Sequence, residues 1–265
     1  MSAIASASVD ADQRPGDDAG VDRRPGAVRL TVVELRKMVN TRAGFWVAIA
    51  VVVITFLLAL IVSLAHGGRN GSAAHVFYVA SFPGSFLLPV IGVLLIAGEW
   101  SQRTTLVTFT LVPSRPRVIA AKAAACVVVS LIALIVTLLC ALVLSALFGH
   151  PPGGVGSISV KVIGQGWVFF VLSMLIGLAF GSALLASAPA IVAYLLLPTI
   201  WNGVVNGFSS LHGLANWLAT DSTLPPLAQG TLSAHEWAQA IVSASAWIGI
   251  PIVIGLWRIC AGDID

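Results

Sequence analysis

The sequence predicts an all-α integral membrane protein with six transmembrane helices, preceded by an amphipathic interfacial helix, with the N and C termini in the cytosol. Three observations predict this fold class: the composition, the length of the apolar runs and the positions of the basic residues. Of the 265 residues, 58% are hydrophobic and only 9% are charged, whereas roughly a quarter of a soluble domain is charged. A soluble core of this size cannot bury so much apolar surface.

The residues before the first long apolar run divide into two parts. Residues 1–27 are rich in Ala, Ser, Asp, Gly and Pro without hydrophobic periodicity, which predicts a disordered cytosolic tail. In residues 28–43 a 4-3-4 spacing places Val28, Val32, Leu35 and Val39 on one stripe of a helix. This pattern predicts a short basic helix that lies on the membrane surface. The alternative is an ordinary solvated helix that leads into the first span.

Six apolar runs match the roughly 20 residues that cross a bilayer. The predicted spans are residues 44–65, 77–97, 118–148, 162–186, 189–208 and 238–257. The third would reach about 46 Å as a helix, so it tilts or projects beyond the hydrocarbon layer. Pro198 and Pro251 are expected to bend the fifth and sixth spans.

The basic residues orient these spans. If every run crosses the membrane, all but two of the 14 lysines and arginines lie on the N-terminal side, the exceptions being Arg69 and Lys161. Cytosolic loops carry this excess of positive charge, so both termini are expected in the cytosol. All five histidines then lie on the external side: His66, His75, His150, His212 and His235. They allow an external metal site, or they are ordinary loop residues, since no HxH or HxxxH spacing joins them.

Several functions lack the residues that they require. The chain has no GxxxxGK[ST] motif, so it is not expected to cradle ATP phosphates by itself. It has no GxSxG or HExxH motif either, and no charged residue lies near the middle of a predicted span. Ion-coupled transporters and intramembrane enzymes usually need such groups. We therefore expect no enzymatic activity, no catalytic residue, and no metal or cofactor bound by this chain.

Weakly polar residues within the spans suggest packing and transport roles. Gly177 and Gly181, and again Gly203 and Gly207, form GxxxG spacings that let helices approach closely, although glycine is common in such helices. Trp201, Asn202 and Asn206 are candidates for a substrate path or, alternatively, for the outer interface, where Trp is enriched. Residues 209–237 are too polar to span. They are expected to form an external helix on the outer leaflet, or a loop that caps the bundle.

The basic break between spans two and three, residues 98–117, carries a second candidate site. It begins with GEWSQRTT and ends with VPSRPR before the third span. Leu106 and Phe109 share a face if this segment is helical, with Arg115 and Arg117 at its rim. A compact, partly apolar and basic segment of this kind fits a groove on a soluble partner. The alternative is a plain cytosolic loop whose arginines only follow the positive-inside rule.

The order of these features resembles the ABC-2 family of ABC transporter permeases. The resemblance covers residues 28–265 and rests on ELRKMVNTRAGFW, GEWSQRTT, VPSRPRVIAAK, a glycine-rich fourth span that runs into the fifth, and the closing WRICAGDID. It implies a six-span permease domain that works as a pair, with a second copy or a sister permease. Two copies of a separate ATP-binding subunit would bind the pair and hold the ATP and Mg.

The resemblance also assigns roles to residues. It makes residues 28–43 a connecting helix, with Arg29, Leu35, Arg36 and Lys37, and residues 98–117 a coupling segment. The residues expected to couple to the ATPase are Glu99, Arg103, Thr104, Thr105, Leu106, Phe109, Arg115 and Arg117.

The expected function is therefore the membrane-spanning permease subunit of an ABC transporter. We expect it in a bacterial plasma membrane, exporting a lipophilic or drug-like substrate of the multidrug kind, with membrane lipid and no nucleic acid as partner. Two alternatives remain: a non-transporting membrane anchor or assembly factor that handles metal through the external histidines, and a secondary transporter.

Overall fold

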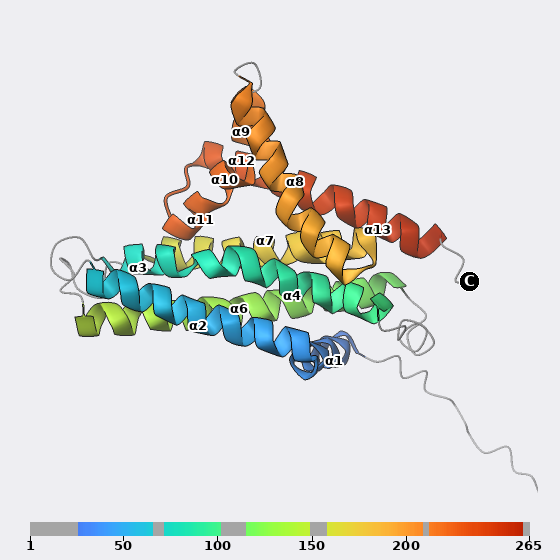
Figure 1. Cartoon of the computed structure of the whole chain (residues 1–265), viewed down its shortest axis with the longest axis horizontal. Helices are drawn as coiled ribbons and strands as arrows, with labels where there is room; N and C mark the ends of the chain where they lie inside the picture. The colour runs from blue at the N-terminus through green and yellow to red at the C-terminus, as the bar shows by residue number, and fades with distance from the viewer. Residues whose placement is uncertain (1–25, 66–71, 102–114, 149–157, 209–211, 262–265) are drawn as a thin grey trace, which may run out of the picture.

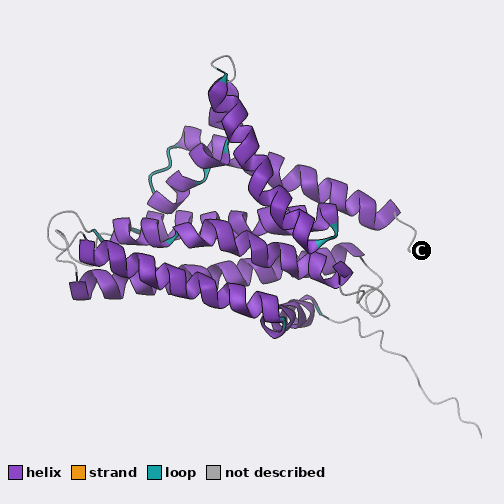
Figure 2. Cartoon of the chain, in the orientation of Figure 1, coloured by secondary structure: helices purple, strands orange, loops and turns teal. Residues whose placement is uncertain are grey.

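A computed structural model describes residues 26–65, 72–101, 115–148, 158–208 and 212–261. These residues are almost wholly helical, and no β-strand occurs among them (Figure 2). In chain order the helices are α1 (Ala27–Asn40), α2 (Arg42–Ala65), α3 (Ala73–Ala80), α4 (Phe82–Ser101), α6 (Arg115–Phe148), α7 (Val160–Leu184), α8 (Ser187–Gly207), α9 (His212–Leu218), α10 (Thr220–Thr223), α11 (Pro225–Gln229), α12 (Ala234–Ala244), the π-helix η3 (Ser245–Gly249) and α13 (Ile250–Ala261).

The prediction of six membrane-spanning helices is confirmed at the level of length and composition. Within the described residues, six helical segments are long and apolar enough to cross a membrane: Arg42–Ala65, Ala73–Trp100, Arg117–Phe148, Val160–Leu184, Ser187–Val205 and Ala234–Arg258. The protein is therefore of the multi-pass membrane type. The predicted tail lies almost entirely outside the described residues.

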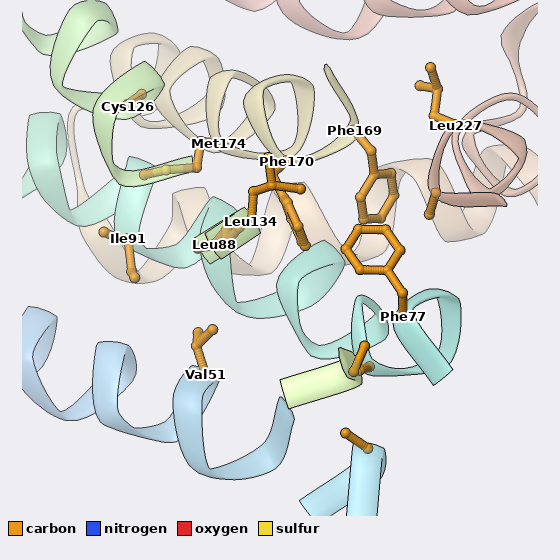
Figure 3. Close-up of a cluster of buried hydrophobic side chains, with 14 of the residues drawn as sticks. Val51, Phe77, Leu88, Ile91, Cys126, Leu134, Phe169, Phe170, Met174 and Leu227 are labelled. Carbon is orange, nitrogen blue, oxygen red and sulfur yellow. The ribbon is translucent and has the colours of Figure 1, made fainter. Parts of the chain in front are cut away.

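Four helices form the main bundle. Helices α2, α4, α6 and α7 lie side by side, with α3 continuing the line of α4 (Figure 1). Their shared core is aliphatic and aromatic, with Phe77, Leu88, Phe170 and Met174 almost fully buried (Figure 3). Helix α1 lies crosswise at one end of this bundle, because the chain becomes extended at Thr41 before α2 begins.

Helices α4 and α7 make the closest contact in the bundle. A Cβ atom on Gly177 would overlap the Pro89 backbone, and one on Gly181 would lie 3.1 Å from the Val93 Cα atom. From the other side, a Cβ atom on Gly92 would lie 2.9 Å from the Leu178 nitrogen. The absence of side chains at these glycines lets the two backbones touch.

Helix α4 contains a proline whose missing hydrogen bond is replaced by a distant side chain. Pro89 has no N–H to bond the carbonyl group of Ser85, four residues earlier. The Tyr194 hydroxyl of α8 donates a hydrogen bond to that carbonyl oxygen at 2.8 Å. This bond both satisfies the proline site and attaches α8 to α4.

The chain turns sharply from α7 into α8. The turn depends on Leu185, which adopts a left-handed conformation with φ of 54° and ends α7. Helix α7 therefore stops at Leu184, short of the predicted boundary at residue 186. From this turn α8 slants away from the main bundle (Figure 1).

The remaining helices form a second layer beside α7. The predicted external segment contains the short helices α9, α10 and α11, and Leu227 of α11 is fully buried in the main core. At Gly230, with φ of 71°, the backbone passes directly against Val162. Helices α12 and α13 follow, joined by the π-turn before Pro251. At the far end, Arg258 donates a hydrogen bond to the Ala183 carbonyl oxygen at 2.6 Å.

Candidate functional site

Two features of the described residues have the chemistry of a functional site. One is a group of four charged side chains where α1, α4 and α6 meet, two of which are buried. The other is a pair of cavities between the main bundle and α8. We describe the charged group first, because its residues come from the two segments that the sequence singles out.

Helix α1 directs a carboxylate, and not its apolar stripe, at the bundle. Val28 of that stripe is 78% exposed, whereas Glu34 is only 4% exposed. Together with Met38, Glu34 forms the buried face of α1. The three valines of the stripe are exposed, and its fourth member, Leu35, packs against the core. The Glu34 carboxylate requires a partner, since a buried unpaired charge is very costly.

Lys122 of α6 supplies that partner. Its side chain is 2% exposed, and its Nζ atom lies 2.6 Å from Glu34 Oε2 and 3.0 Å from Glu99 Oε1. Its Nζ atom donates hydrogen bonds to that Glu34 oxygen and, at 2.9 Å, to the Leu95 carbonyl oxygen of α4. The buried ammonium group thus has two hydrogen bonds and two ion-pair partners.

Lys37 completes the group, which we call the ionic cluster: Glu34, Lys37, Glu99 and Lys122. Its Nζ atom lies 2.9 Å from Glu34 Oε1 and 2.6 Å from Glu99 Oε1. Burial lowers the pKa of Lys37, but hydrogen bonds and charge interactions with both carboxylates outweigh burial and hold this pKa above its ordinary value. Two carboxylates and two ammonium groups alternate, so the cluster has no net charge.

The ionic cluster links three helices through paired charges. Each charge is paired, and removal of one partner of a buried pair typically costs several kcal/mol. The cluster ties α1 simultaneously to the end of α4 and to the first turns of α6. These two helices are joined by residues 102–114, which lie outside the described residues.

The first cavity, of about 440 Å³, lies between α3, α4, α7, α8 and the α10–α11 segment. Its walls combine aromatic rings, aliphatic side chains and hydroxyl groups, and no charged group lines it among the side chains that the structure describes. Phe82, Phe86, Phe169 and Tyr194 are among its aromatic residues. A cavity of this size accommodates a small organic molecule.

The second cavity, of about 510 Å³, lies between α7, α8 and the η3–α13 helix. It is lined almost entirely by apolar side chains, with Arg258 at one end. Trp201 also lines it, and the indole nitrogen of Trp201 is buried without a hydrogen-bond partner among the described residues. The polar groups here are therefore hydrogen-bond donors.

The predicted connecting-helix residues fall into two groups. Lys37 belongs to the ionic cluster and Leu35 packs against the core, whereas Arg29 and Arg36 are exposed. Among the predicted coupling residues, Glu99 belongs to the cluster and Arg117 is exposed at the start of α6. Arg115 begins α6. The other five lie outside the described residues: Arg103, Thr104, Thr105, Leu106 and Phe109.

The residues predicted to line a substrate path lie in different surroundings from one another, and so do the glycines predicted to pack helices. Trp201 lines the second cavity, while Asn202 is buried and lines neither cavity, with its Oδ1 atom unpaired among the described residues. Asn206 lies in the last turn of α8. Gly177 and Gly181 meet α4, whereas a Cβ atom on Gly203 or Gly207 would meet nothing within 4 Å.

No metal centre forms among the residues that the structure describes, where no three His, Cys, Asp or Glu side chains come together. Comparison with known proteins adds no assignment: no protein-family model matches the chain, and no curated protein matches it significantly. Only the sequence and the two sites described above therefore bear on the function of the chain.

Sequence reasoning missed two members of the ionic cluster. Glu34 lies outside the apolar stripe of the predicted interfacial helix, and Lys122 ends the VPSRPRVIAAK motif, but neither is among the predicted site residues. A signal existed in AAKAAA, where Lys122 lies among alanines at the start of a long apolar run. A lysine inside such a run calls for a carboxylate partner.

Proposed function

We propose that this chain is the membrane-spanning permease subunit of an ATP-driven transporter of the ABC-2 type. In this proposal it resides in a bacterial plasma membrane and exports a lipophilic, drug-like substrate. Two copies of a separate ATP-binding subunit drive a pair of such permeases. The energy comes from outside the chain, because its sequence has no phosphate-binding motif.

The observation that carries the proposal is the ionic cluster. It attaches α1, the expected connecting helix, to the two helices that flank the expected coupling segment. A soluble subunit that pushes on α1 or on that segment would therefore displace α4 and α6 as one body. A plain membrane anchor has no need to interlock four charged side chains at one end of its bundle, two of them, Glu34 and Lys122, buried. A buried charge must be paired to be tolerated.

The cavities support the second part of the proposal. Both lie where α8 meets the main bundle, and both are predominantly apolar. A movement of α4 against α8 would change the shape of the space between them. A lipophilic molecule could thus be bound in one arrangement and released in another, as alternating access requires.

The test is a mild-detergent pull-down of the tagged chain from its native membrane, with identification of the co-purifying proteins and an ATPase assay of the eluate. A stoichiometric soluble protein with a GxxxxGK[ST] motif, together with ATP hydrolysis, is the expected result. A chain that purifies without an ATPase would overturn the proposal, provided that a known ABC complex survives the same detergent. The anchor and secondary-transport alternatives would then take its place.

A further inference from the structure

The first cavity has a chemical polarity that its residue types alone do not reveal. Seven of its lining residues carry a hydroxyl group. A free hydroxyl group can donate or accept a hydrogen bond, so such a cavity would at first sight accept many ligands. The hydrogen bonds that five of these groups make restrict the choice of ligand.

Four of the five donate to a backbone carbonyl in or beside their own helix. Ser81 donates to Phe77, Ser85 to Phe82, Ser173 to Phe169 and Thr199 to Leu195, at 2.7, 2.7, 2.8 and 2.7 Å. A carbonyl oxygen can only accept, so the hydroxyl group must donate its single proton. This arrangement is common for Ser and Thr within helices.

The fifth is Tyr194, whose proton is used at the carbonyl of Ser85 beside Pro89. Its proton is committed for a structural reason, since the proline leaves that carbonyl without its helical partner. With their protons used, all five oxygens have only lone pairs left to offer. These polar groups of the cavity are therefore hydrogen-bond acceptors.

The aromatic walls point to the same class of ligand. Phe82, Phe86, Phe169 and Tyr78 line the cavity, and aromatic faces attract cations. Among the side chains that the structure describes, no lysine or arginine lines the cavity to bind an anion, and no acidic group lines it to bind a cation by charge. An ammonium group would meet aromatic rings and oxygen acceptors, whereas a carboxylate would meet lone pairs.

We propose that the first cavity binds a lipophilic molecule that carries a protonated amine as its hydrogen-bond donor. The inference depends on the proposed function only in naming this molecule as the transported substrate. The second cavity provides an internal contrast, because the Trp201 indole and the Arg258 guanidinium group make its polar groups donors. An amine is thus selected by the first cavity and disfavoured by the second.

The test is equilibrium binding to the purified full-length chain in lipid nanodiscs, with empty nanodiscs to correct for partition into lipid. Three probes share a naphthalene ring: 2-(1-naphthyl)ethylamine, its N,N,N-trimethylammonium analogue and 3-(1-naphthyl)propanoate. The expected order of affinity is amine, then trimethylammonium, then carboxylate, with roughly a tenfold gain for each charge-assisted hydrogen bond. A carboxylate that binds as tightly as the amine, or no binding above that of empty nanodiscs, overturns the proposal.

Serine variants test the acceptors. Ser173→Ala is expected to weaken amine binding about tenfold and to leave trimethylammonium binding unchanged, because that analogue has no N–H to donate. The matched control is Ser130→Ala: Ser130 is equally buried and donates to its own helix at 2.8 Å, but lies in α6 outside both cavities. Equal effects of the two variants on the amine would overturn the proposal.

A steric variant tests the location. Thr199 is exposed at the margin of the cavity on α8, so Thr199→Trp can fill the cavity without disturbing the core. It is expected to abolish binding of the amine, and retained binding overturns the assignment to this cavity. None of these measurements needs an ATPase. Failure here is therefore distinct from failure of the pull-down, which tests the permease proposal itself.

Discussion

Helices α7 and α8 follow each other in the chain, have similar composition and each contain a GxxxG spacing, yet they are held in opposite ways. Over the most apolar 18 residues of each helix, 67% of the residues of α7 are buried, but only 22% of those of α8. The glycines of α7 touch the backbone of α4, while those of α8 face open space. Hydrogen bonds attach α8 and the second layer to the main bundle at a few points, such as Tyr194 to α4 and Arg258 to α7.

This difference indicates which part of the molecule can move. Close backbone contact is stiff, because interiors packed at this density transmit displacement and do not absorb it. A helix attached at a few points can shift without such a cost. Both cavities lie along the boundary between α7 and α8, so a shift of α8 changes their volume while the α4–α7 pair stays intact. Four predictions test this contrast, from the largest expected effect to the smallest.

Lys122→Met should destabilise the well-packed region most. The substitution leaves Glu34 and Glu99 with only Lys37 as a cationic partner in the ionic cluster, and loss of one member of a buried pair costs about 3–5 kcal/mol. Unfolding of the purified protein in nanodiscs, followed by circular dichroism, measures the loss. The control is Lys161→Met, an exposed lysine at the start of α7, and equal midpoints for the two variants would contradict the role of the cluster.

Gly177→Leu compares the two glycine motifs directly. The new side chain would collide with the Pro89 backbone, and overpacking of this kind costs about 3 kcal/mol. Gly203→Leu, made in the same way on α8, should leave the folding of the chain unchanged, because its Cβ atom meets nothing nearby. Unfolding midpoints of the two variants provide the comparison. Similar destabilisation by both would show that α8 is as tightly packed as α7.

Tyr194→Phe removes one of the few attachments of α8. It leaves the Ser85 carbonyl without its hydrogen-bond donor, at a cost of about 1 kcal/mol. Hydrogen exchange should accelerate in α8 and near Ser85 but not in α7. Tyr78→Phe, in the same cavity, serves as the control. Exchange that rises equally in α7 and α8 would argue against independent movement of α8.

Alkaline pH should produce the smallest effect, through Lys37. Because its pKa is raised above 10.5 in the folded protein, protonation of Lys37 favours the folded state below pH 10.5 and this contribution is lost as the pH rises through the raised pKa. The difference in unfolding midpoint between wild type and Lys37→Met should therefore be present at pH 8 and vanish at strongly alkaline pH. A difference that persists there would mean that Lys37 stabilises α1 through packing alone.

The number of spans was predictable from the sequence because a bilayer imposes one length on every crossing helix. The lengths of the apolar runs therefore located six helices to within a few residues. Their ends were less certain, since they depend on local conformations such as the left-handed Leu185. The predicted orientation of the termini remains a prediction.

The contacts that distinguish one helix from another were not predictable. GxxxG occurs in both α7 and α8, and no local feature of the sequence indicates which of the two glycine pairs packs against a neighbouring helix. The hydrogen bond from Tyr194 to Ser85 joins residues 109 apart in the sequence, so no periodicity reveals it. The ionic cluster likewise needs the crosswise position of α1, which is a property of the folded chain.

The π-turn at residues Ser245–Gly249 has a consequence for rotation about the axis of the last span. A π-turn holds one more residue than an α-turn. If that residue passes into the regular helix, every side chain beyond it rotates by about 100° around the helix axis. Arg258 would then swing off the Ala183 carbonyl, to which it is bound at 2.6 Å. That bond and the close approach of Gly255 to Ser182 hold the angular setting of α13, and their release would rotate the α13 side chains that line the second cavity.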